Sequence, residues 1–206
     1  RTLIMDVPGG ERFDPLAPEK RAPLRSLALS PDVKIQRIGA LSLVVHGDDK
    51  APAAIEKAWP KMETAHKRLA LAAWPPSLGD PGAEVLGRLL VKEKNQDLRP
   101  EVLQALARTS GGVSRRRRLE RATKPGGDER DRAVAVGLAA RKLSDEQIAK
   151  LADELSSVGS ELRHAIIELC AVRGVTSAGP KIAALGINQA DRQTTFVALY
   201  RLGSKD

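Results

Sequence analysis

The chain has 206 residues, of which 34 are basic and 26 acidic, so its formal charge at pH 7 is +8. Only 2% of the residues are aromatic, which leaves few rings for stacking on bases, sugars or flat cofactors. The single cysteine, Cys170, cannot form an internal disulfide, and no apolar stretch reaches the roughly 18 residues of a membrane-spanning helix. We therefore expect no membrane insertion, and a core built from Leu, Ala, Val and Ile.

Residues 1–30 differ from the rest in their proline and glycine content, which argues against a long helix. The residues concerned are Pro8, Gly9, Gly10, Pro15, Pro18 and Pro23. Thr2–Val7 is compatible with a short strand. We predict an extended arm or linker that lies against the first helix, with a disordered lead from an upstream domain as the open alternative. Because the chain begins with Arg1, a removed leader stays possible; we expect a cytoplasmic location, with the periplasm or secretion also open.

From residue 31 onward, two kinds of helical segment alternate. The longer kind has anchors spaced by 31, 34, 32, 31 and 30 residues: Leu41, Ala72, Leu106, Leu138, Leu169 and Leu199. The shorter kind has an apolar stripe with intervals of 31, 33, 32 and 34 residues, marked by Ile55, Leu86, Leu119, Leu151 and Leu185. Two independent series with one period predict a stacked helical repeat.

The expected boundaries follow from these two series. The longer helices are predicted at 32–46, 63–74, 99–109, 129–142, 160–173 and 190–203. The shorter helices are predicted at 51–59, 83–93, 114–122, 145–156 and 179–186. The longer helices are followed by glycines, where a left-handed residue commonly ends a helix: Gly47, Gly79, Gly111, Gly174 and Gly203.

Three further local signals refine this pattern. Ser144 and Gln147 have the spacing of a capping box before the helix at 145. Three prolines crowd Trp74–Gly82, so we expect a longer, stiffer loop there. Gly137 stands inside a helix, where Gly costs roughly 1 kcal/mol relative to Ala; this suggests a close helix approach, with an exposed position as the alternative.

The order of residues in the first repeat carries a family resemblance. Asp32–Lys34 are followed by Ala40 and Leu41, then by Gly47–Asp48 and the short helix from Ala51, and Gly79–Asp80 repeat the turn. This order resembles the short bacterial HEAT repeats, which are also found in phycobilisome-lyase-type repeat proteins. The Trp, Tyr and Phe positions of tetratricopeptide repeats and the Thr-Pro-Leu-His stretch of ankyrin repeats are missing.

The resemblance covers about 31–203 and implies an all-α fold. The fold would be a right-handed α-solenoid of about five HEAT-like helix pairs plus one extra helix, with an extended N-terminal arm. The expected domains are therefore the arm over 1–30 and a HEAT-like repeat domain over 31–206. Repeat motifs of this kind specify a fold and leave the function open.

A series of basic residues stands near the starts of the longer helices: Lys34, Lys67, Arg99, Arg132, Arg163 and Arg192. One interpretation is a binding stripe for phosphates or an acidic partner. The other, implied by the resemblance, is that these residues bond the loops between neighbouring repeats, and we favour it.

The sharpest charged feature is the run Arg115–Arg118, inside a patch at 96–127 that holds eight basic and three acidic residues. Consecutive helical residues point about 100° apart, so at least one of the four must pack against the fold. The functional hypothesis is contact with an anion, a nucleic acid or an acidic protein. The alternative is a solvated basic helix paired with Glu120, Glu129 or Asp131. In the usual HEAT geometry this short helix lies on the convex side, which weakens the nucleic-acid hypothesis.

We predict no catalytic residues, no metal site and no cofactor. The histidines stand far apart without nearby ligands, Cys170 is expected to be a small buried residue, and Trp59 and Trp74 are expected to pack in the core. The predicted partner-binding residues are Arg108, Arg115, Arg116, Arg117, Arg118, Arg141 and His164.

These observations favour a non-catalytic protein-interaction scaffold or assembly module, and not an enzyme. Its expected partner is another protein with an acidic surface. The alternative is a nucleic-acid-binding HEAT-like protein with a DNA glycosylase-like groove, which would use the basic patch at 96–127. Such glycosylases rely on Trp residues and an Asp in their concave groove. The only comparable pair in this sequence is Trp74 with Asp80, which falls in a proline-rich turn. A chromophore lyase is disfavoured by the single cysteine and the scarce aromatics.

Overall fold

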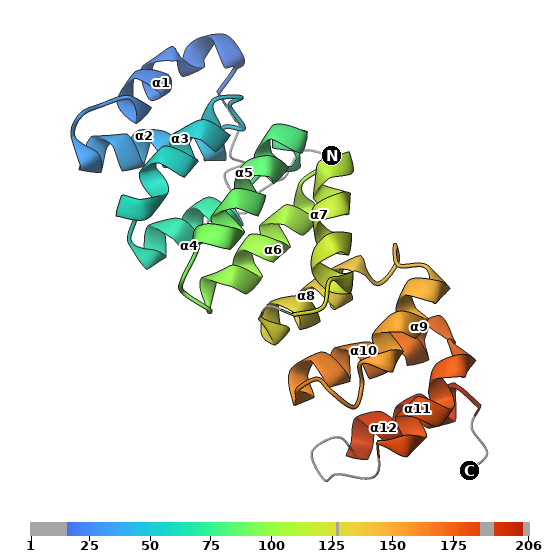
Figure 1. The fold of residues 1–206 in the computed structure, drawn as a ribbon. Helices are drawn as coiled ribbons and strands as arrows, with labels where there is room; N and C mark the ends of the chain where they lie inside the picture. Colours follow the sequence, from blue (N-terminus) through green and yellow to red (C-terminus); the bar gives the residue numbers. More distant parts are fainter. Residues whose placement is uncertain (1–15, 127, 186–191, 204–206) are drawn as a thin grey trace, which may run out of the picture. The chain divides into compact units, whose positions relative to one another are not determined.

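The structure is a computed structural model that describes residues 16–126, 128–185 and 192–203. These residues form helices and no strand (Figure 1). The α-helices are α1 (Ala22–Ala28), α2 (Val33–Val45), α3 (Ala51–Ala58), α4 (Thr64–Ala72), α5 (Gly79–Lys92), α6 (Leu98–Arg108), α7 (Gly112–Thr123), α8 (Glu129–Ala139), α9 (Asp145–Asp153), α10 (Ser160–Arg173), α11 (Gly179–Ala184) and α12 (Arg192–Arg201). The prediction of an all-α protein is confirmed for the described residues.

Helices α2–α12 match the eleven predicted segments, with ends that differ by a few residues. The capping box of Ser144 and Gln147 is present at the start of α9. Gly174 ends α10 in the left-handed conformation, with φ 65° and ψ 34°, as the sequence predicted. The loop at 73–78 is shorter than expected, because Pro76–Leu78 form a 3-10 turn that leads directly into α5.

The prediction of an extended arm over residues 1–30 is wrong for the part that the structure describes. Pro18–Arg21 form a 3-10 turn, and α1 follows directly. Proline is tolerated here because Pro18 and Pro23 stand in the first turns, where a backbone N–H has no intrahelical acceptor. Helix α1 packs on α2, where Gly39 allows the two backbones to approach. The strand considered for Thr2–Val7 lies outside the described residues.

The chain divides into two compact units, Arg1–Ser114 (unit 1) and Arg115–Asp206 (unit 2). The division falls inside α7. Within unit 1, the longer helices α2, α4 and α6 contact one another in that order, and α3 contacts α5. Within unit 2, α10 contacts both α8 and α12, and α9 contacts α11.

Small aliphatic side chains supply most of each core. In unit 2, buried Leu, Ile, Val and Ala side chains form one cluster, which includes Leu162, Ile166 and Cys170. In unit 1, Trp74 is the largest fully buried side chain. The prediction that Trp59, Trp74 and Cys170 are packing residues is confirmed.

Candidate functional site

Helix α7 carries the arginine run, and the division between the two units falls within this helix. In unit 1, the Val113 N–H donates to Asp80 Oδ1 at 3.0 Å, and Ser114 Oγ donates to the Leu106 carbonyl. In unit 2, the later part of α7 is held by Ala122, which is buried in the core cluster, and by the partly buried Leu119. The buried and partly buried apolar side chains of the helix thus leave Arg115 and Arg116 at the surface.

The four arginines differ in exposure, as helix geometry requires. Arg115 and Arg116 are exposed, whereas Arg117 and Arg118 are half-buried. Arg116 lies 3.8 Å from Glu120 in an i,i+4 ion pair whose side chains are 62% and 57% exposed. A pair this exposed neutralises little charge and stabilises weakly. With five arginines and one glutamate, α7 has a balance of +4.

The environment of Arg118 is unfavourable for positive charge. Burial lowers the pKa of the Arg118 guanidinium, and the charge of Arg115 lowers the pKa further. An arginine nevertheless stays protonated at physiological pH. An anion bound at this surface would therefore relieve the repulsion between the two guanidinium groups.

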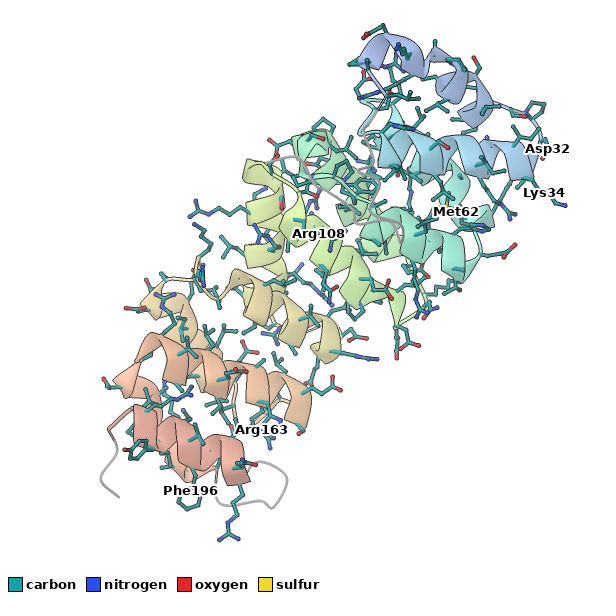
Figure 2. All side chains as sticks on the ribbon, turned by 180° about the vertical axis from the view of Figure 1, so that it is seen from behind. Asp32, Lys34, Met62, Arg108, Arg163 and Phe196 are labelled. Atoms are coloured by element: carbon teal, nitrogen blue, oxygen red, sulfur yellow. The ribbon has the colours of Figure 1, made fainter. Side chains whose placement is uncertain are left out.

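The structure gives Arg108 a role inside the fold. Its Nη2 donates to the Leu71 carbonyl at 2.6 Å, at the end of α4 (Figure 2). Arg173 does the same in unit 2, where its Nη1 donates to the carbonyls of Ala140 and Leu143 at 2.8 and 3.0 Å. The last carbonyls of a helix lack intrahelical donors, so both arginines cap the preceding longer helix.

The other two predicted binding residues lie in unit 2. Arg141 is exposed in the turn after α8, and His164 is half-buried on α10. Arg108 belongs to unit 1, whereas the α7 arginines belong to unit 2. The seven predicted residues therefore do not come from one compact unit, and the run on α7 is the part that forms a continuous surface.

Most members of the basic series bind their own fold. Arg99 Nη1 donates to two carbonyls at the end of α5, at 2.7 and 2.8 Å. Arg163, labelled in Figure 2, donates to two carbonyls that precede α10, at 3.0 and 2.7 Å. Arg132 is buried and forms a bidentate ion pair with Glu154 at 2.9 and 3.2 Å. The structural interpretation is confirmed for these three residues, while Lys34 is exposed and points away from the fold in Figure 2.

Glu93 is a buried carboxylate that joins three segments of unit 1. Its Oε2 accepts from Trp59 Nε1 at 2.9 Å and from Lys67 Nζ at 2.8 Å, and its Oε1 accepts from the Asn95 N–H at 2.9 Å. Burial alone would raise the pKa of Glu93, but these hydrogen bonds outweigh burial and hold its pKa below the ordinary value. The Lys67 ammonium also lies 5.1 Å from the centroid of the Trp59 ring. This cluster accounts for Trp59 and Lys67 as structural residues.

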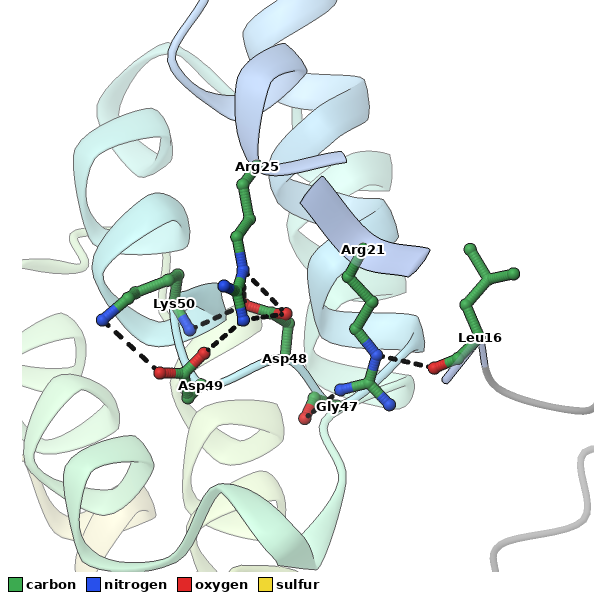
Figure 3. Close-up of polar contacts among 7 residues, drawn as sticks. All are labelled: Leu16, Arg21, Arg25, Gly47, Asp48, Asp49 and Lys50. Carbon is green, nitrogen blue, oxygen red and sulfur yellow. Dashed lines mark hydrogen bonds and ion pairs between the residues drawn. The ribbon is translucent and has the colours of Figure 1, made fainter. Parts of the chain in front are cut away.

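A second polar cluster fixes α1 to the turn before α3 (Figure 3). Asp48 is completely buried and accepts from Arg25 Nη2 at 2.9 Å and from the Lys50 N–H at 2.9 Å. Arg25 also bonds Asp49 at 2.8 Å, and Arg21 donates to the Gly47 carbonyl at 3.2 Å. Burial alone would raise the pKa of Asp48, but the bonds from Arg25 and the Lys50 amide hold it below its ordinary value.

Beside this cluster, α1, α2 and α3 enclose a groove with a volume of about 380 Å³. Its lining is apolar at the bottom and basic at the rim, and it consists of Arg25, Ala28, Leu29, Leu43, Lys50, Ala53, Ala54 and Lys57. Sequence reasoning missed this groove because residues 1–30 were expected to be extended. The available signal was Pro23 at a helix start followed by Leu24, Leu27 and Ala28 at helical spacing.

Comparison of the chain with protein-family models, with curated proteins and with solved structures gives no match. Within the described ranges, no helix is both long and apolar enough to cross a membrane. Among the same residues, no three His, Cys, Asp or Glu side chains are grouped as they would be around a metal ion.

Proposed function

We propose that this protein is a non-catalytic interaction scaffold of HEAT-like repeats, stacked as a right-handed α-solenoid, and that it binds an acidic partner protein. The contacts between successive longer helices and between successive shorter helices within each unit support the repeat stacking. Side-chain bonds one repeat apart support it as well. Arg88, for example, forms a bidentate pair with Glu56, 32 residues earlier, at 2.9 and 2.8 Å.

The charge of α7 is the observation that carries the functional proposal. Arg115 and Arg116 are exposed, and Arg115 disfavours the charge of Arg118. A basic surface of this kind accelerates association with an acidic protein and selects against basic partners.

The same arginines would attract phosphates, so nucleic acid is the second candidate. Helix α7, however, contains no aromatic residue on which a base would stack. Both tryptophans are buried, and Trp74 is completely enclosed, so neither offers a base-stacking surface. We therefore rank the acidic protein above the nucleic acid.

The test compares two variants. The α7 variant changes Arg115–Arg118 to Gln. The control changes four exposed lysines elsewhere to Gln: Lys20, Lys34, Lys61 and Lys142. Both lose four positive charges, and circular dichroism verifies that both remain folded. The probes are an acidic Glu- and Asp-rich peptide and a duplex DNA, each at about 0.15 M salt. We expect the parent to bind the acidic peptide. We expect it to bind the DNA only weakly. The α7 variant should associate with the peptide about tenfold more slowly, and the control should change much less.

Two results would contradict this proposal. Equal losses in the α7 variant and in the control would mean that net charge, not α7, determines binding. Tight, sequence-selective DNA binding at the same salt concentration, lost only in the α7 variant, would establish the nucleic-acid alternative instead.

A further inference from the structure

The groove in unit 1 is built from matching faces of two helices. On α1 and its C-cap, the lining residues Arg25, Ala28 and Leu29 are spaced i, i+3 and i+4, so they share one face. On the α3 side, Lys50, Ala53, Ala54 and Lys57 follow the same spacing and extend it to i+7. Leu43 of α2, which is almost fully buried, lies at the bottom. The groove is thus an elongated surface between two helices.

The shape of the groove is set by small side chains. Ala53 and Ala54 form one wall, and Ala28 lies on the other side. Small residues allow another backbone to come close, as they do wherever helices pack tightly. Leu29 stands at the edge and is 73% exposed, which is a large apolar area for a solvent-facing position. An occupant would cover this leucine.

Cations stand at both ends of the groove. Lys50 lies just before the first turn of α3 and Lys57 in its last turn, which places them about 10 Å apart along the axis at 1.5 Å per residue. Arg25, beside Lys50, bonds Asp48 and Asp49, and Lys50 Nζ itself lies 3.4 Å from Asp49 in an exposed, weak ion pair (Figure 3). Lys57 is exposed and forms no ion pair within the described part of the chain.

We propose that this groove binds an acidic amphipathic helix of a partner protein. Apolar side chains at i, i+3 or i+4 and i+7 would lie over Ala53, Ala54 and Leu29, which is the usual pattern for a helix in a groove. Of two carboxylates spaced two turns apart, one would meet Lys57, and the other would replace the exposed Asp49 as the partner of Lys50. A single-headed amphiphile would use only one of these ends, and a second copy of this basic face would be repelled by it.

This inference does not depend on α7. The groove lies in unit 1, and its eight lining residues belong to α1, α2 or α3, or directly adjoin them, as Leu29 and Lys50 do. The Arg115–Arg118 to Gln variant should therefore keep groove binding, so failure of either proposal leaves the other testable.

The experiment uses the full chain and a labelled peptide with a Leu stripe at i, i+3, i+4 and i+7 and Glu residues beside its ends. A scrambled peptide of identical composition and a fatty carboxylate are the comparison ligands. Fluorescence anisotropy gives the dissociation constants for the parent and for Lys57→Glu, Leu29→Ser and Lys34→Glu. Lys34 is exposed at the start of α2 and does not line the groove. Lys34→Glu therefore serves as the control, because it makes the same change in charge as Lys57→Glu.

We expect Lys57→Glu and Leu29→Ser each to weaken peptide binding by about tenfold, and Lys34→Glu to change it by less than about twofold. All three positions are exposed or at a rim, and thermal unfolding verifies that the variants fold. Equal binding of the scrambled peptide would overturn the proposal. So would equal losses in Lys34→Glu and Lys57→Glu, or displacement of the peptide by a second copy of the chain.

Discussion

Gly39 in α2 faces the backbone of Ala28 in α1 with no room for a side chain between them. A β-carbon at position 39 would lie 2.8 Å from Ala28 Cα, and it would also press on the Leu27 carbonyl carbon. Backbone atoms cannot rotate away as a side-chain end does, so α1 itself would have to move. We therefore predict that Gly39→Ala lowers the free energy of unfolding by about 1–3 kcal/mol, although Ala is the better helix former. Urea unfolding measures the change, and an unchanged midpoint would refute the close contact.

Gly137 in α8 should behave in the opposite way. A β-carbon there would meet nothing within 4 Å, and the residue is exposed. The hypothesis of a close helix approach at Gly137 is therefore wrong, and its exposed alternative is confirmed. Gly137→Ala is expected to raise the free energy of unfolding by about 0.5–1 kcal/mol, because it removes backbone freedom from the unfolded chain. A destabilised Gly137→Ala variant in the same urea titration would contradict this account.

The Glu93 cluster should make stability depend on pH. The pKa of Glu93 in the folded chain lies below its ordinary value of 4.5, so its stabilisation is complete above that value and is lost as the pH falls through the folded pKa. Glu93→Gln should lower the free energy of unfolding by about 1–3 kcal/mol at neutral pH, because three donors lose a charged acceptor. The difference from the parent should shrink below about pH 4.5. Glu146→Gln, in an exposed pair with Lys150, is the control and should change stability by less than about 0.5 kcal/mol.

The thiol of Cys170 should be inert in the folded protein. Burial raises its pKa to about 11, and the residue is completely buried in the core of unit 2. Thiolate is the reactive form, so an aromatic disulfide reagent at about pH 8 should modify the native chain only as fast as unit 2 opens. Urea should make the reaction fast and complete. Immediate stoichiometric labelling without denaturant would show that Cys170 is accessible.

The helices themselves could be predicted because their apolar residues repeat with the helical period. Leu162, Ile166 and Leu169, for example, are all buried on α10, as their spacing indicated. Helix ends were predictable where a residue has one dominant role, as at Ser144 and Gly174. Helix α1 could not be predicted from proline content, because Pro18 and Pro23 stand in first turns, where they do not interrupt a helix.

The candidate site was only partly predictable. The run Arg115–Arg118 is visible in the sequence, and its split between exposed and half-buried residues follows from helix geometry. The role of Arg108 is not visible, because no local pattern shows that its guanidinium reaches the carbonyl of Leu71, 37 residues earlier. The groove beside Lys57 is also a tertiary feature, since it exists only when α1 packs on α2.

Side-chain bonds between helices that are close in the sequence have a consequence for how the chain acquires its structure. Lys67 and Glu93 are 26 residues apart, and Arg173 and Ala140 are 33 residues apart. Such partners are synthesised close together in time, so in the proposed repeat stack each helix pair would need only the next one to become stable. Folding of this kind starts at several points and proceeds quickly, since no loop longer than about one repeat has to close. In the repeat stack proposed above, damage to one pair of helices would loosen its immediate neighbours and leave the more distant pairs intact.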